Sequence, residues 1–388
     1  MIMKNILIIS KNTGLKTEFE KTSFFKNIKT WPSLDYKITD KIDILIVDDK
    51  TIAYSQYIQN FSKFLKLVRS NYYIAGDIDT HSTINKVLSS YGIIVIPPFL
   101  TDTQICQKIC SLTVEDFATG KNTVCFFGSG PGAGTSMISQ SVAQVLSDIT
   151  GKSTGFLSLD GSEGIDYFDI DLDSHGLGQI KERLINNILS PEELKNSCIK
   201  SSSLFFLPGE KEISKVRHYQ PDHIEKLVDL CSKTFDIVII NGGSAITGMS
   251  IGALNSSKLK LLVTTQSDKH FRNFNNLLDQ IFVNLGISSD DFSLVVNKYI
   301  DSGELETEIG LAKKYGMPLA SVIPLLEYIP SLEAEKKKKT LLGYDRVYSN
   351  SIKQLAVSIC GELGIEILYT GKKDGQSRNF FKKILGKV

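Results

Sequence analysis

The feature that most constrains the fold is a glycine-rich turn between an apolar run and a helical pattern. The run "TVCFF" (123–127) leads into "GSGPGAGTS" (128–136), and "SMISQSVAQVL" (136–146) then has helical spacing. A strand that passes through such a turn directly into a helix is the phosphate-binding unit of many α/β folds. We therefore expect a parallel sheet in this part of the chain, with an anion site at the end of its first strand.

The turn has the residues that a phosphate cradle needs, with one exception. Gly130, Gly132 and Gly134 allow positive φ and a close approach of the backbone to a ligand. Successive N–H groups can then converge on an anion at the N-terminus of the helix. Ser136 stands where the magnesium-binding hydroxyl belongs, but Thr135 replaces the usual lysine and carries no charge. Ala133 and Met137 complete the predicted nucleotide-binding segment.

The rest of the chain alternates short apolar runs with helical patterns, which predicts doubly wound α/β domains. The expected strands of the first domain are 5–10, 42–49, 72–77 and 93–99, with a helical pattern at 81–92 between the last two. Those of the second domain are 123–127, 153–160, 202–208, 235–241, 259–265, 292–298 and 318–324. We place a receiver-like (flavodoxin-like) domain at 1–115, a linker at 116–122, a P-loop domain at 123–370 and a basic tail at 371–388.

Composition excludes several classes of protein. The 388 residues include 42% hydrophobic and 22% charged residues, which is ordinary for a globular protein with a sizeable core. The six cysteines form no Cys-x-x-Cys pair and indicate free thiols of a cytosolic protein. No apolar run approaches the ~18 residues of a membrane span, and the start is too polar for a signal peptide. The five histidines show no metal-ligand spacing and receive no role.

The order of these motifs resembles the MinD/ParA group of P-loop ATPases, whose deviant loop is Lys-Gly-Gly-x-Gly-Lys-Thr-Thr. Aligned on Gly134, Gly130 falls on the signature lysine, Thr135 on the second lysine and Ser136 on the first threonine. A receiver-like domain before a MinD-like domain with a degraded loop is similar to the CpaE/TadZ group. These are the localisation and assembly ATPases of tight-adherence (Flp) pili, and some of them also have Gly-Thr-Ser at this point.

The resemblance implies ATP and Mg²⁺ as ligands and assigns further residues. In "SLD", Asp160 keeps the second acid of the family's Asp-x-Asp and is expected to act on the attacking water or, with Ser136, on the metal. In "FDIVIINGG", Asn241 replaces the Walker B aspartate, and an amide contributes no negative charge. Asn297 in "LVVNK" is the candidate reader of adenine, and Pro324 is expected to pack beside the base.

Loss of both lysines and of the Walker B acid predicts ATP binding with weak or absent hydrolysis. The main alternative is an active MinD/ParA-type ATPase, in which Asp160 organises the attack and Lys152 or Lys298 supplies the charge. Two more hypotheses stay open: a ParA-like DNA-binding partition factor, and a fold that binds no nucleotide. The net charge of +1 does not favour a protein that binds nucleic acid or another polyanion. The segment "EAEKKKKT" (333–340) is typical of a solvated helix face or loop.

The first domain lacks the groups that a phosphate-accepting receiver uses. Ser10 and Lys11 follow the first strand, where an acid pair would hold magnesium. Asp48 or Asp49 could occupy the acceptor position, but Pro97 stands where the lysine is expected. We interpret this domain as a docking module for pilus or secretion proteins, by analogy of fold.

The tail has a composition of its own. A polar segment (371–377) leads to "SRNFFKKILGKV", in which two phenylalanines, Ile384 and Leu385 alternate with basic residues. It resembles the membrane-targeting helix of MinD, and each basic residue near an anionic bilayer contributes ~1 kcal/mol. The alternative is a helix packed on its own domain. We expect a cytoplasmic homodimer, peripheral at the inner face of the cytoplasmic membrane, where dimerisation raises avidity through residues 378–388.

Overall fold

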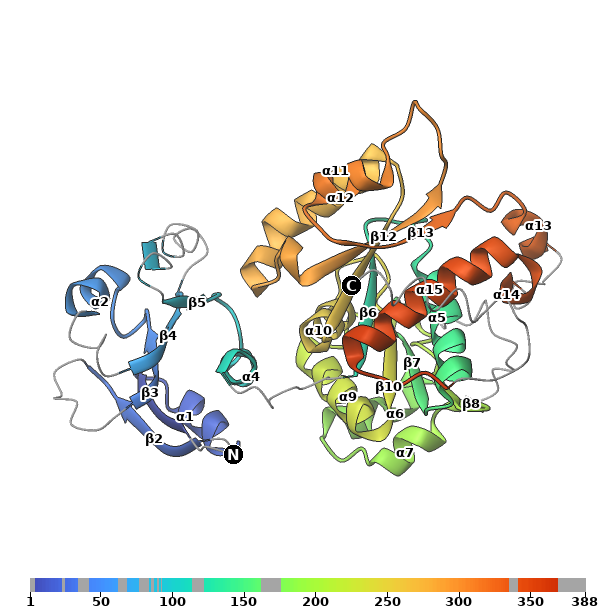
Figure 1. Cartoon of the computed structure of the whole chain (residues 1–388). Coiled ribbons are helices and arrows are strands. Elements are labelled where there is room, and N and C mark those ends of the chain that lie inside the picture. Colours follow the sequence, from blue (N-terminus) through green and yellow to red (C-terminus); the bar gives the residue numbers. More distant parts are fainter. Residues whose placement is uncertain are drawn as a thin grey trace.

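The computed structural model describes residues 4–22, 25–33, 42–61, 68–76, 84, 87–88, 91, 93–113, 122–161, 176–334 and 341–368. These residues form two α/β units, drawn in blue to teal and in green to red in Figure 1. The expected tail helix (378–388) lies outside the described residues, as do most of the helical pattern at 81–92 and the linker apart from Asn122.

The first unit alternates strands and helices, as the apolar runs predict. Its elements are β1 (Lys4–Ile9), α1 (Thr13–Glu20), β2 (Phe25–Trp31), β3 (Ile42–Asp48), α2 (Tyr54–Phe61), β4 (Val68–Ile74), β5 (Ile94–Ile96) and α4 (Asp102–Thr113). The strands form a sheet in the order β2-β1-β3-β4-β5, and every pair is parallel. This is the strand order of flavodoxin-like folds.

The second unit is larger. Its sheet contains β6 (Thr123–Gly128), β7 (Thr154–Ser158), β8 (Ile199–Ser201), β9 (Leu204–Leu207), β10 (Ile237–Asn241), β11 (Leu259–Thr264), β12 (Phe292–Tyr299) and β13 (Leu319–Pro324). The strand order is β13-β12-β11-β6-β10-β7-β9-β8, and only β8 pairs antiparallel. The first strand, β6, thus lies between β11 and β10 in the middle of the sheet.

Helices cover both faces of this sheet (Figure 1). They are α5 (Thr135–Thr150), α6 (Leu177–Ile185), α7 (Pro191–Asn196), α8 (Ile213–Val216), α9 (Pro221–Thr234), α10 (Gly248–Ser256), α11 (Asp268–Leu277), α12 (Glu308–Tyr315), α13 (Ile329–Ala334), α14 (Leu341–Tyr344) and α15 (Arg346–Leu363). A π-helical turn (Leu278–Phe282) and two 3₁₀ turns (Val283–Leu285, Ser289–Asp291) follow α11.

Each face of the central sheet has its own apolar core. Helices α5 and α15 pack together over one face, with Val142 and Leu146 of α5 against Ile352 and Leu355 of α15 in the same cluster. Helices α9, α10 and α11 supply the core on the other face. Because β6 is buried along its whole length, both faces must be apolar, which explains its continuous run of hydrophobic residues.

The apolar runs predict the long central strands, except that β4 runs from Val68 to Ile74 where 72–77 was expected, and two edge strands are missed. β2 ("FKNIKTW") lies at the edge of the first sheet and exposes Lys26 and Asn27, so it has no continuous apolar run. β8 is three residues long and lies at the edge of the second sheet. The expected strand 93–99 is shorter than predicted, because β5 ends at Ile96 and Phe99 has a φ of 66°.

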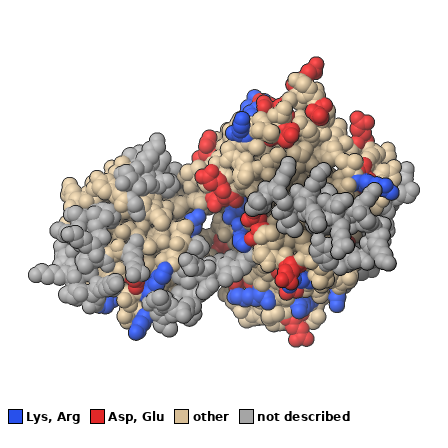
Figure 2. Space-filling view, viewed as in Figure 1, with Lys and Arg blue, Asp and Glu red and all other residues tan. Residues whose placement is uncertain are grey.

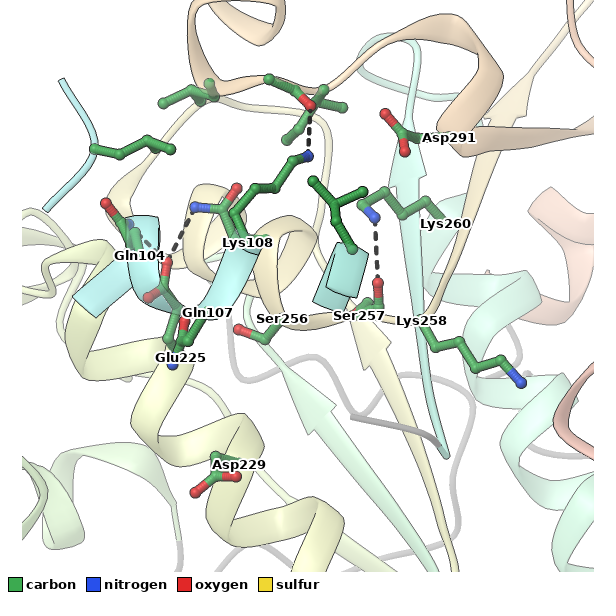
Figure 3. Close-up of a pocket in the computed structure, with 16 residues that line it drawn as sticks. Gln104, Gln107, Lys108, Glu225, Asp229, Ser256, Ser257, Lys258, Lys260 and Asp291 are labelled. Atoms are coloured by element: carbon green, nitrogen blue, oxygen red, sulfur yellow. Dashed lines mark hydrogen bonds between the residues drawn. The ribbon is translucent and has the colours of Figure 1, made fainter. Parts of the chain in front are cut away.

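The two units meet along α4. The Gln104 side chain donates to Oε1 of Glu225 at 2.8 Å, and Lys108 Nζ donates to the carbonyl of Gly286 at 3.0 Å. Figure 3 shows the cavity of about 370 Å³ that these residues line together with Lys260. Burial lowers the pKa of Lys260, whose ammonium donates to the Ser257 carbonyl at 3.2 Å.

Candidate nucleotide-binding site

The glycine-rich turn begins where β6 ends, and both neighbouring strands hold its base. The Gly128 N–H donates to the carbonyl of Gly243, just past β10, at 2.7 Å. The Ser129 N–H donates to the carbonyl of Val263 in β11 at 2.9 Å. The loop therefore lies at the carboxyl edge of the sheet, in the crevice where α/β folds bind ligands.

Two of the predicted glycines have a positive φ, which is 80° in Gly132 and 96° in Gly134. A Cβ on Gly132 would meet no atom within 4 Å, so the loop is open on that side. A Cβ on Gly134 would lie 2.1 Å from Nδ2 of Asn297. Gly134 also precedes α5 and gives its first turn no side-chain cap, so the N–H groups there suit an anion.

The side chains at the end of the loop and the start of α5 differ in whether they point into the protein or toward the ligand side. Thr135 is buried, and its Oγ1 lies over the end of β6, 2.5 Å from the position that a Cβ on Gly128 would take. Its hydroxyl fills space against the strand. Ala133 and Met137 are also buried, and the Tyr348 hydroxyl donates to the Met137 carbonyl at 3.4 Å. The part of this segment that can face a ligand is therefore its backbone and Ser136.

Ser136, Asp160 and Asn241 converge on one another, as the motif order predicts. Asn241 is fully buried, and its Nδ2 donates to Asp160 Oδ2 at 2.8 Å and to Ser136 Oγ at 3.1 Å. Ser136 Oγ donates to the same Asp160 oxygen at 3.2 Å, and Ser158 donates to the other at 3.1 Å. The Gly243 N–H donates to Asn241 Oδ1 at 3.2 Å and so fixes the amide orientation.

This network decides how well the residues fit a magnesium ion. One hydroxyl (Ser136) and one carboxylate (Asp160) suit Mg²⁺, which takes one or two carboxylates together with phosphate oxygens. The Asn241 amide, however, directs its N–H donors toward the same two oxygens. Among the described residues, no group of three or more His, Cys, Asp or Glu side chains could hold a metal. The donor set fits Mg²⁺ only together with phosphate ligands.

Two residues of α11, His270 and Asn273, contact the loop without having been predicted from the sequence. Asn273 Nδ2 donates to the Ser129 carbonyl at 2.5 Å, and His270 Nε2 lies 3.3 Å from the Pro131 carbonyl. Burial lowers the pKa of His270, and its Nδ1 lies 2.8 Å from the Thr265 hydroxyl. No metal spacing or motif marks these residues in the sequence, because α11 reaches the loop only through the fold.

The remaining predicted residues lie at different distances from the loop. Asn297 is buried, and its Nδ2 donates to the Ala133 carbonyl at 2.8 Å, so it contacts the loop. Pro324 ends the edge strand β13 and pairs in register with Tyr299. Lys298 is exposed and close enough to His270 for its charge to affect that pKa. Lys152 precedes β7 and so lies at the opposite edge of the sheet.

A cavity of about 480 Å³ opens beside Asp160. Its lining includes Gly161, the N-terminus of α10 at Thr247 and Gly248, and Arg217. Arg217 is exposed and is a cation that no sequence motif marks. A guanidinium can bind phosphate oxygens through paired hydrogen bonds.

The acids of the first unit are engaged with their neighbours. Asp48 Oδ2 accepts from the Ser10 hydroxyl at 2.7 Å, and Oδ1 accepts from the Lys50 N–H at 3.1 Å. Asp49 accepts from the Tyr73 hydroxyl. Ser10 therefore satisfies Asp48 at the point where a receiver would place a magnesium-binding acid.

Solved structures resemble the second unit. A ParA family ATPase from Chlorobium tepidum matches 61% of this chain and 99% of its own, with 19% identity and a TM-score of 0.54. The unit has the fold of the MinD/ParA ATPases. MinD from Pyrococcus horikoshii, complexed with Mg-ADP, matches 61% of this chain and 95% of its own (14% identity, TM-score 0.51). A variant of Cyanothece McdA in complex with ATP matches 65% of this chain and 100% of its own (15% identity, TM-score 0.51).

These likenesses confirm the predicted P-loop fold. No family model matches the chain, and no curated protein matches it. The finer resemblance to the CpaE/TadZ group and the receiver-like nature of the first unit therefore stay predictions. No helix among the described residues is long and apolar enough to cross a membrane. On the face drawn in Figure 2, basic and acidic side chains are interspersed rather than gathered into one basic patch.

Proposed function

We propose that the protein binds ATP as a conformational ligand, with weak or absent hydrolysis, and positions or assembles a larger machine. The observation that carries the nucleotide part is the loop, which keeps its glycine backbone while the groups for chemistry are replaced. Gly132 and Gly134 have the positive φ of an anion-binding turn, and α5 begins without a side-chain cap. Thr135 and Asn241 occupy the places of a lysine and of an acid.

Each part of the site has its own task in this proposal. Backbone N–H groups of the loop and of the first turn of α5 bind the phosphates, and Ser136 with Asp160 holds Mg²⁺. The metal, when bound, neutralises phosphate charge. Asn297 is the proposed contact for adenine, and Pro324 is proposed to pack beside the base. Among the residues that the structure describes at the site, Asp160 is the acid that could orient a water, so slow turnover is all that we expect from it.

The biological role follows from the resemblance of the motifs and is part of the proposal. We infer a localisation or assembly factor for a tight-adherence (Flp) pilus or a related secretion machine, acting as a homodimer. We propose that the first unit is a docking module and not a phosphate-accepting receiver. Its candidate acceptor acids, Asp48 and Asp49, are hydrogen-bonded to Ser10 and Tyr73. Residues 378–388 are the proposed membrane contact.

The deciding experiment is titration calorimetry of the full chain with ATP, with and without Mg²⁺, while phosphate release is followed in the same sample. Binding without turnover supports the proposal. Binding with clear turnover supports the alternative of an active ATPase. No binding at millimolar ATP refutes the nucleotide part.

A second experiment tests the location. Co-sedimentation with anionic vesicles is compared between the full chain and a chain that ends at residue 370, with DNA as the competing ligand. We expect the full chain to sediment with the vesicles and the shortened chain to stay in the supernatant. Binding to DNA and not to vesicles would favour a partition factor.

A further inference from the structure

The carbonyls of the glycine-rich turn are hydrogen-bonded at nearly every position. Those of Ser129, Pro131 and Ala133 face three side chains, namely Asn273 at 2.5 Å, His270 at 3.3 Å and Asn297 at 2.8 Å. The carbonyl between the first two, on Gly130, accepts from the Ala133 N–H at 3.2 Å. The three side chains come from α11 and β12, which are far from the loop in sequence.

This alternation has a consequence for the N–H groups. A trans peptide is planar, so the N–H of one residue points opposite to the carbonyl of the residue before it. Fixing the carbonyls of residues 129, 131 and 133 therefore fixes the N–H directions of Gly130, Gly132 and Gly134. These are three of the four glycines in the segment 128–136, and all three N–H groups are directed away from α11 and β12. N–H groups held on one side of a loop in this way can form an anion-binding concavity.

The three side chains are themselves held in place. His270 and Asn273 are three residues apart and so share one face of α11. The Pro131 carbonyl can only accept, so His270 donates to it from Nε2, and a neutral His270 then accepts from the Thr265 hydroxyl at Nδ1. Thr265 Oγ1 also accepts from the Ser267 N–H at 3.2 Å. Asn297 is 1% exposed. The loop and α11 also fit each other sterically, since a Cβ on Gly130 would lie 3.0 Å from His270 Cδ2.

We propose that Asn273, His270 and Asn297 are positioning residues that hold this lysine-free loop in its phosphate-binding shape. Polyphosphate binding then depends on the direction of backbone N–H groups and not on a charged side chain of the loop. The inference rests on the proposed nucleotide binding and extends it to residues outside the motif. It also assigns Asn297 a role toward the phosphates in addition to any role toward the base.

The first test uses Asn273, which is partly exposed and so can be changed with little effect on the core. Asn273→Ala removes one donor, and we expect about fivefold weaker binding, the equivalent of about 1 kcal/mol. Asn273→Asp is nearly isosteric but places an acceptor against the Ser129 carbonyl, so we expect a larger loss, of about tenfold or more. Asn284→Asp is the matched control, because its amide also donates to a carbonyl, that of Gln280, on the surface.

Two probes separate positioning from other effects. Titration calorimetry is done with Mg-ATP and with inorganic tripolyphosphate, which has no base. The affinities for the two probes should fall by the same factor, first from the wild type to Asn273→Ala and further in Asn273→Asp. The thermal midpoint of each variant should stay near that of the wild type. His270→Gln should retain binding, because its amide can donate to Pro131, and His270→Leu should lose it.

The other possible outcomes distinguish failure of the positioning role from failure of nucleotide binding itself. If the wild type binds both probes and Asn273→Asp binds them equally well, the positioning role is wrong and nucleotide binding stands. A loss for Mg-ATP alone also overturns the role, since it would act through the base. If the wild type binds neither probe at millimolar concentration, the proposed function fails first.

Discussion

Replacement of Asn241 by aspartate probes the centre of the candidate site. In the wild type, Nδ2 of Asn241 lies 2.8 Å from Asp160 Oδ2 and 3.1 Å from Ser136 Oγ, and it donates to both. In Asn241→Asp, an oxygen takes the place of this nitrogen, so two carboxylates face each other. The change converts the bridging donor into a second negative charge at nearly constant volume.

Two routes give the same magnitude for this change. Two like charges 4 Å apart repel by about 4 kcal/mol at an effective dielectric constant of about 20. The pair can avoid this repulsion by taking up a proton, which at pH 7 costs about 4 kcal/mol for a carboxyl of pKa about 4. We therefore expect the second unit of Asn241→Asp to be about 4 kcal/mol less stable without Mg²⁺. A bound Mg²⁺ between the two carboxylates should recover most of the loss.

The assay can follow the two units separately. Trp31, the single tryptophan of the chain, lies in β2 of the first unit, so its fluorescence follows that unit. Far-UV circular dichroism follows both units. In urea, with EDTA, the dichroism midpoint of the second unit should fall by roughly 2 M for a slope of about 2 kcal/mol/M. The fluorescence midpoint should stay near the wild-type value, as it should in the control Asn284→Asp.

The reasoning is refuted if Asn241→Asp unfolds at the wild-type urea concentration in EDTA. It is also refuted if Mg²⁺ changes the two proteins equally, because the new carboxylate would then not face Asp160. Acidification offers an independent check. The difference from the wild type should shrink as the pH falls from about 7 toward 4, since a shared proton removes the repulsion.

Three further predictions concern the loop, the cavity beside Asp160 and the contact between the two units. Gly134→Ala places a Cβ against the Asn297 amide at a φ of 96°, so we expect at least tenfold weaker ATP binding in calorimetry, with Gly303→Ala, whose Cβ meets nothing within 4 Å, as the control. Arg217→Ala should weaken ATP binding about tenfold if this cation reaches the phosphates, and unchanged affinity would exclude that contact. Burial raises the pKa of Glu225, so the stability that its protonated form contributes is lost as pH rises through that pKa. In thermal denaturation, Glu225→Gln should therefore be more stable than the wild type at pH 8, and the difference should vanish by pH 4.

Local sequence predicts the fold of this chain well where strands are buried on both faces. Such strands must be apolar throughout, so the runs that become β6 and β10 are visible without any structure. The same argument fails at sheet edges. β2 and β8 keep polar residues because one side of each strand faces solvent, and their short or mixed patterns resemble loops.

The candidate site divides in the same way. The sequence by itself determined the glycine turn, the loss of both lysines and, through its resemblance to the MinD/ParA motifs, the grouping of Ser136 with Asp160. The strand order β6-β10-β7 then brings Asn241 to the same two side chains. Only the tertiary structure decided that His270 and Asn273 hold the loop carbonyls. Their contacts with the loop span more than 130 residues of sequence and depend on how α11 packs, which no local spacing encodes.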